Sequence, residues 1–159
     1  MSELAIELSQ VTKRFGPKVA VNAVSLAIPR GQVYGLIGPN GAGKTTAFSM
    51  MCGFLHPTTG SLKVMGVTPT TPGALKGKLG ALPQDAILTA GWEVGELLTY
   101  WARLSGLAQP EREAREALEK VGLADAWSTQ TQALSHGMAK RTSMAQALMG
   151  RPPLVLLDE

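Results

Sequence analysis

A glycine-rich run carries the strongest chemical signal in this chain of 159 residues. The run consists of Gly38, Pro39, Asn40, Gly41, Ala42, Gly43, Lys44, Thr45 and Thr46. It fits the phosphate-loop pattern G-x-x-x-x-G-K-[ST], in which glycines let backbone N–H groups converge closely on a polyphosphate. Lys44 is expected to reach the β- and γ-phosphates, and the Thr45 hydroxyl is expected to meet Mg²⁺. The run therefore predicts a nucleotide-binding site.

The flanks of this loop are those that a phosphate loop needs. The apolar run from Val33 to Ile37 comes before it and is expected to be a strand buried on both faces, central in a parallel sheet. A helix is expected to begin at about Lys44, with its free N–H groups and positive dipole end adding to the anion site. A glycine-rich turn that merely contains lysine is the alternative, and the two flanks argue against it.

The remaining apolar patterning is typical of a mixed α/β chain. An antiparallel pair of strands is expected at 4–8 and 19–28, joined by a turn at 15–18. Further short strands are expected at 61–65, 79–83 and 154–157. The last expected helix runs from about 134 to 149 with Ser135 as its N-cap.

Residues 90–130 are expected to form a small helical subdomain on an α/β core made of residues 1–89 and 131–159. One helix should begin near Glu93, and its apolar face consists of Val94, Leu97, Leu98, Trp101 and Leu104. A second should begin at Pro110 and stop at Gly122. Its exposed side offers the ion pairs Glu111 with Arg115 and Glu116 with Lys120. The expected packing anchors of the subdomain are Trp92, Trp101 and Trp127.

Composition narrows the class of protein. With 45% hydrophobic and 17% charged residues, the chain is expected to form one globular domain. The net charge of +3 is scattered without runs, so no nucleic-acid partner is expected. A single cysteine, Cys52, favours a reducing compartment such as the cytosol. No run of 18 apolar residues or signal-peptide layout is seen, so membrane association is expected only through a partner.

Four pieces in a fixed order resemble an ABC-transporter ATPase domain. They are the loop at 38–46, Gln84 after a short strand, the segment 134–138, and Asp158-Glu159 after an apolar strand. The resemblance spans almost the whole of 1–159. It implies an α/β fold, with a P-loop NTPase core, an N-terminal antiparallel β subdomain and a helical insertion, and it implies ATP and Mg²⁺ as ligands.

The resemblance also implies roles for single residues. Phe15 matches the aromatic residue that stacks on adenine, although packing beside the turn is an alternative for it. Gln84 matches the glutamine that reaches Mg²⁺ and the attacking water. Asp158 matches the aspartate that holds Mg²⁺ through water, and Glu159 matches the catalytic carboxylate that polarises the attacking water. A helix cap or a solvated turn is the alternative for the two adjacent acids.

Ser135 and Gly137 match the family's signature sequence, which in a head-to-tail dimer contacts the γ-phosphate held by a second ATPase subunit. The usual signature is Leu-Ser-Gly-Gly-Gln, whereas here His136 and Met138 stand at its third and fifth positions. A basic residue followed by Gly-Met resembles signatures of exporters for drugs, antibiotics, heme or polysaccharides. His136 is therefore interpreted as a tolerated variant.

The resemblance predicts an ATP-hydrolysing subunit that energises transport, with export favoured, through a separate transmembrane permease. It would lie in the cytoplasm, held on the inner face of the membrane by that permease. The sequence ends at Glu159, before the family's aspartate loop and switch histidine, so the domain is expected to be incomplete, poorly active and left with exposed strand edges. A soluble ABC-type ATPase unconnected with transport and an inert nucleotide-binding fragment are the alternatives.

Overall fold

The computed structural model describes residues 3–71 and 73–158. The contacts divide the chain into two compact units, Met1–Lys78 together with Asp158, and Leu79–Leu157. Within the described ranges, no helix is both long and apolar enough to cross a bilayer.

The first unit is built on a three-stranded antiparallel sheet of order β2-β1-β3. The strands are β1 (Leu4–Phe15), β2 (Lys18–Pro29) and β3 (Thr59–Val64), and they confirm the predicted pair and the strand near 61–65. The hairpin closes where Phe15 pairs with Lys18, since Gly16 (φ 56°) takes the left-handed conformation that a tight turn requires. The buried side chains of β1 and β3 include Ile6, Leu8, Val11, Leu62 and Val64.

Helix α1 (Lys44–Met51) begins at the predicted position and belongs to this unit. It buries Phe48, Met50 and Met51. The helix ends at Met51, and Gly53 (φ 80°) lies two residues beyond it, where an added Cβ would collide with the Pro69 carbonyl. That close backbone approach allows only glycine at this position.

The segment 33–37 is the main correction to the predicted fold. It forms no strand, and the side chains of Val33 and Ile37 are 105% and 95% exposed. An apolar strand is buried only when neighbouring strands pair with its edges and helices cover its faces. Within the described residues, no strand pairs with this segment, so its apolar side chains face solvent.

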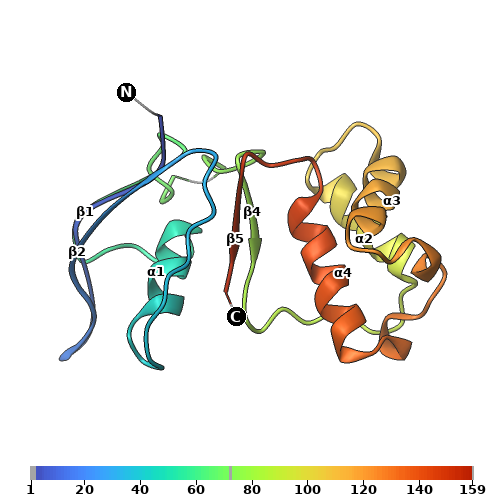
Figure 1. Cartoon of the computed structure of the whole chain (residues 1–159), viewed down its shortest axis with the longest axis horizontal. Helices are drawn as coiled ribbons and strands as arrows, with labels where there is room; N and C mark the ends of the chain where they lie inside the picture. The colour runs from blue at the N-terminus through green and yellow to red at the C-terminus, as the bar shows by residue number, and fades with distance from the viewer. Residues whose placement is uncertain (1–2, 72, 159) are drawn as a thin grey trace. The chain divides into compact units, whose positions relative to one another are not determined.

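The second unit combines a parallel strand pair with three helices. Strands β4 (Leu79–Leu82) and β5 (Leu154–Leu157) confirm the two predicted strands, and the structure shows that they pair in parallel. Figure 1 shows helices α2 (Val94–Leu104), α3 (Pro110–Lys120) and α4 (His136–Leu148) grouped together. Short 3₁₀ turns at Ala124–Ala126 and Thr131–Ala133 connect α3 to α4.

The helices pack around one apolar cluster. Its buried members are Val94, Leu98, Ala114, Ala117, Leu118, Leu123, Ala126 and Ala145. Trp101 and Trp127 pack against this cluster, as predicted for two of the three tryptophans. Trp92 instead pairs with Tyr100, with ring centroids 5.4 Å apart. Leu104 was predicted on the apolar face of its helix but is 63% exposed at the last residue of α2.

Ion pairs on α3 follow the prediction in part. Arg115 pairs with Glu111 at 2.9 Å, as predicted. Glu116 does not pair with Lys120 but accepts hydrogen bonds from Arg112 at 2.8 Å and from Arg151 at 2.6 Å. The two guanidinium groups hold the pKa of Glu116 below its ordinary value, with the Arg112 hydrogen bond as the largest cause. A bridge of this kind fastens α3 to the turn between α4 and β5.

Candidate nucleotide-binding site

The phosphate loop has the backbone that its sequence predicts. Gly41 (φ 83°) and Gly43 (φ 88°) both take left-handed conformations, which residues with a Cβ rarely adopt. Gly43 also lies against β2, where a Cβ would fall well inside 3.0 Å of the Ala20 carbonyl oxygen and 3.1 Å from Val21 Cγ2. The loop therefore packs directly against β2, and the absence of a Cβ at Gly43 permits this close packing.

Lys44 connects the loop to α1. Its ammonium donates hydrogen bonds to the carbonyl oxygens of Gly38 (2.6 Å) and Pro39 (3.0 Å), so the side chain folds back over the loop. The first turn of α1 carries no acidic residue, which leaves the positive end of the helix dipole available to an anion. Thr45 is exposed and Thr46 is half-buried beside it. A cation, free N–H groups and a hydroxyl thus stand together where a polyphosphate would be bound.

Phe15 is brought near this loop by the strand register. Its ring is 47% exposed at the end of β1, opposite Lys18 on β2. Ala20, the residue that touches Gly43, lies two residues further along β2, about 7 Å at the usual rise of a strand. A nucleotide whose phosphates occupy the loop could therefore extend its base toward Phe15.

Asp158 is the buried acid of the first unit. It is 8% exposed, and its Oδ2 atom is buried without a hydrogen-bond partner in the described part of the chain. Burial, and secondarily the Asp158 charge, raises the pKa of the Cys52 thiol to about 12. A buried carboxylate oxygen without a partner requires an explanation, and a hydrated Mg²⁺ would supply one. The unpartnered Asp158 oxygen therefore fits the Mg²⁺ ion that the sequence predicts.

No group of three or more His, Cys, Asp or Glu residues that could hold a metal occurs in the ranges described. The predicted Mg²⁺ set is of another kind, because it combines one carboxylate with the Thr45 hydroxyl and the Gln84 amide. Gln84 is exposed and follows β4, whose last residue Leu82 pairs with Leu157 immediately before Asp158. Glu159, the predicted catalytic carboxylate, lies outside the described residues.

Ser135 and Gly137 are exposed at the beginning of α4. The Ser135 hydroxyl accepts a hydrogen bond from the Met138 N–H at 3.3 Å, which confirms the predicted N-cap. Further along α4, Arg141 donates a hydrogen bond to the Val121 carbonyl at 3.2 Å. The start of α4 therefore has a hydroxyl and backbone N–H groups at an exposed position, the chemistry that helix N-termini offer to anions.

One residue beside the site was missed by sequence reasoning. Lys13 Nζ lies 5.2 Å from the centroid of the Phe15 ring and donates a hydrogen bond to the His56 carbonyl at 2.8 Å. Residues i and i+2 of a strand lie on the same face, and that spacing was the available signal.

The sequence matches a known family and several of its members. A family model described as ABC transporter matches residues 21–159. The "Probable multidrug ABC transporter ATP-binding protein YbhF" of Escherichia coli K12 is 38% identical over 161 residues, covering 99% of this chain and 28% of that protein. The "Nod factor export ATP-binding protein I" of Burkholderia thailandensis is 37% identical over 162 residues, covering 100% of this chain and 53% of that protein.

The fold is also similar to that of solved structures. One described as an ATP binding subunit of an ABC transporter superposes with a TM-score of 0.85 at 25% identity, covering 98% of this chain and 66% of that one. Judged by the two curated relatives of the previous paragraph, the chain spans about a quarter to a half of a relative's length.

Proposed function

Because the chain belongs to the ABC transporter family, we propose that it binds ATP with Mg²⁺ at the phosphate loop and, within the intact protein, hydrolyses ATP to energise transport. The observation that carries the proposal is the loop from Gly38 to Lys44, seated on β2 by Gly43 and opening into α1. The relatives named for multidrug transport and Nod factor export favour export as the direction.

The predicted phosphate-binding, metal-binding and catalytic residues each have a role in this proposal. Lys44 leaves the loop carbonyls and neutralises the β- and γ-phosphates, while the loop N–H groups hold their oxygens. Thr45, Gln84 and Asp158 would hold Mg²⁺, which supplies charge neutralisation between the phosphates. Glu159 orients and polarises the attacking water. Because phosphoryl transfer depends mainly on positioning and electrostatic stabilisation, no covalent intermediate on the protein is needed.

Two partners follow from the proposal. The exposed start of α4 would reach the γ-phosphate bound by a second ATPase subunit, which gives a head-to-tail dimer closed by ATP. The Gln84 loop and the helical subdomain 90–130 would dock a transmembrane permease and so hold the protein at the inner face of the membrane.

A binding measurement tests the central part of the proposal. Lys44→Ala should abolish binding of a fluorescent ATP analogue, because it removes the only side-chain cation of the phosphate loop. Lys63→Ala, on the exposed side of β3, is the matched control and should bind as the unmodified chain does. Undiminished binding by Lys44→Ala would refute the site assignment.

A further inference from the structure

Lys13 is held in one place by two independent contacts. On one side its ammonium lies 5.2 Å from the centroid of the Phe15 ring, within the range of a cation–π interaction. On the other, the same ammonium donates a hydrogen bond to the His56 carbonyl at 2.8 Å. A surface lysine usually keeps its charged end free in water, so a doubly held ammonium has a defined position.

The carbonyl that anchors Lys13 belongs to a segment that is itself fastened to β1. The Thr58 N–H donates to the Thr12 carbonyl at 2.7 Å, and the Arg14 N–H donates to Thr58 Oγ1 at 3.0 Å. These bonds lie on both sides of Lys13 in the sequence. The position of the ammonium is therefore set by backbone, and the Phe15 ring is oriented against a fixed charge.

We propose that Lys13 is a positioning residue for the adenine base: it covers one face of Phe15 and leaves the other face as the stacking surface. This inference rests on the proposed function. Fixing the ring before binding lowers the ordering cost of stacking. A cation on the covered face also draws π-electron density toward itself, which favours stacking of an electron-rich base on the opposite face.

The proposal predicts a selective effect on ligands that contain a base. Lys13→Met keeps the alkyl chain but removes the charge and the hydrogen bond. It should weaken ATP binding about two- to five-fold, the change expected for a cation–π contact near the surface. Binding of inorganic tripolyphosphate should be unchanged, because that ligand has no base to stack. Lys13→Arg, which keeps a cation and a donor, should restore ATP binding.

The test is isothermal titration of the whole chain with ATP and with tripolyphosphate. Lys18→Met is the matched control, because it removes the same charge from the residue that pairs with Phe15 across the hairpin. It should not change the preference for ATP over tripolyphosphate. Phe15→Ala should weaken ATP binding by about five-fold or more, the loss expected for base stacking, and Lys13→Met should add nothing in that background.

The outcomes separate the two claims. Weaker ATP binding by Phe15→Ala together with unchanged binding by Lys13→Met overturns the role of Lys13 and leaves the proposed function standing. Equal weakening of ATP and tripolyphosphate binding by Lys13→Met also overturns it, because the effect would then be one of net charge. Unchanged ATP binding by Phe15→Ala refutes adenine stacking itself, and the role of Lys13 falls with it.

Discussion

Replacing Gly43 by alanine tests whether the phosphate loop is seated on β2 as described. Two costs arise. The left-handed conformation (φ 88°) costs an L-residue about 1–2 kcal/mol. The new Cβ would also press on the Ala20 carbonyl, which is backbone and cannot turn aside. Overpacking of this kind costs about 1–3 kcal/mol, so the total destabilisation should be about 2–5 kcal/mol.

Gly41→Ala separates the two costs. Gly41 has nearly the same conformation (φ 83°), but nothing lies within 4 Å of its added Cβ. It should therefore lose only the conformational part, about 1–2 kcal/mol. For a chain of this size 1 kcal/mol shifts the melting temperature by about 2–4 °C.

The assay is thermal unfolding followed by circular dichroism, without nucleotide. Gly43→Ala should melt several degrees below Gly41→Ala. It should also bind a fluorescent ATP analogue more weakly, since the loop must lift away from β2 to admit the methyl group. Equal melting temperatures for the two variants would refute the contact between Gly43 and β2.

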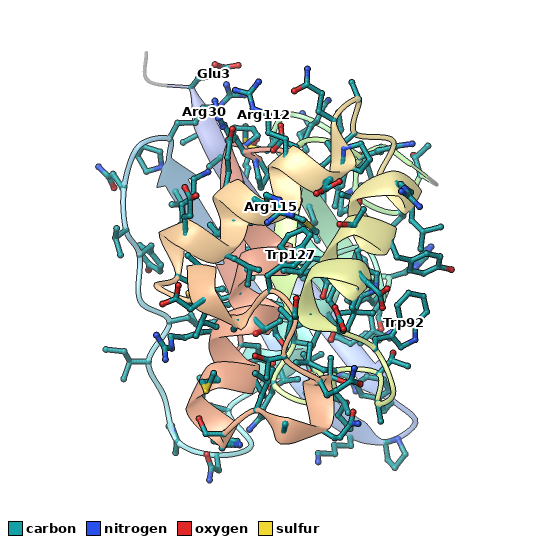
Figure 2. The ribbon with its side chains drawn as sticks, turned by 90° about the vertical axis from the view of Figure 1, so that its right-hand side faces the viewer. Glu3, Arg30, Trp92, Arg112, Arg115 and Trp127 are labelled. Carbon is teal, nitrogen blue, oxygen red and sulfur yellow. The ribbon has the colours of Figure 1, made fainter. Side chains whose placement is uncertain are left out.

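Three further results are expected. Gly95→Ala should lower the melting temperature by several degrees, because the new Cβ would collide with the Trp127 ring. The Arg115 guanidinium lies over that ring, 3.7 Å from its centroid (Figure 2). An unchanged melting curve would count against this packing. Since the pKa of folded Glu116 is below its ordinary 4.5, its hydrogen bonds stabilise the fold above that pH and are lost as the pH falls through the lowered pKa. In an acid titration followed by circular dichroism, the folded fraction of Glu116→Gln should therefore fall less steeply with decreasing pH than that of the unmodified chain. An unchanged profile would contradict the Glu116 hydrogen bonds to Arg112 and Arg151. Burial raises the pKa of the Cys52 thiol to about 12, so little of the reactive thiolate is present at about pH 8. Iodoacetamide at that pH should therefore alkylate the folded chain at least roughly a hundred-fold more slowly than the urea-unfolded chain. Comparable alkylation rates would contradict the burial of the thiol.

The sequence was sufficient to predict those features of the structure that depend only on residues close together in the chain. The hairpin at Phe15–Lys18, the start of α1 at Lys44 and the Ser135 cap follow from turn and capping chemistry within a few residues. The segment 33–37 shows the limit of that reasoning. Its apolar pattern is that of a buried strand, but burial depends on strands and helices that a local pattern does not specify.

The candidate site likewise has residues that could be predicted from the local sequence and residues that could not. The phosphate loop could be predicted because its chemistry is contained in nine consecutive residues. The spacing of Lys13 and Phe15 indicated that they share a strand face, but the second contact that fixes Lys13, the His56 carbonyl, is 43 positions away and could not be predicted from the sequence. Glu116 is a similar case. A spacing of four residues suggested Lys120, but the bridge to Arg151 spans 35 positions and depends on where α3 packs.

The packing of the second unit links two of the proposed contacts. Gly80 in β4 lies so close to α4 that an added Cβ would collide with the Ala147 carbonyl and meet Pro152 at 2.9 Å. Strand β4, the end of α4 and the turn into β5 are thus in direct contact, and they cannot move independently without breaking that contact. Ser135 begins the same helix, about 20 Å away at the usual helical rise. If the dimer closes as proposed, a displacement at Ser135 would therefore shift β4, and with it the Gln84 loop, which is the proposed contact for the permease.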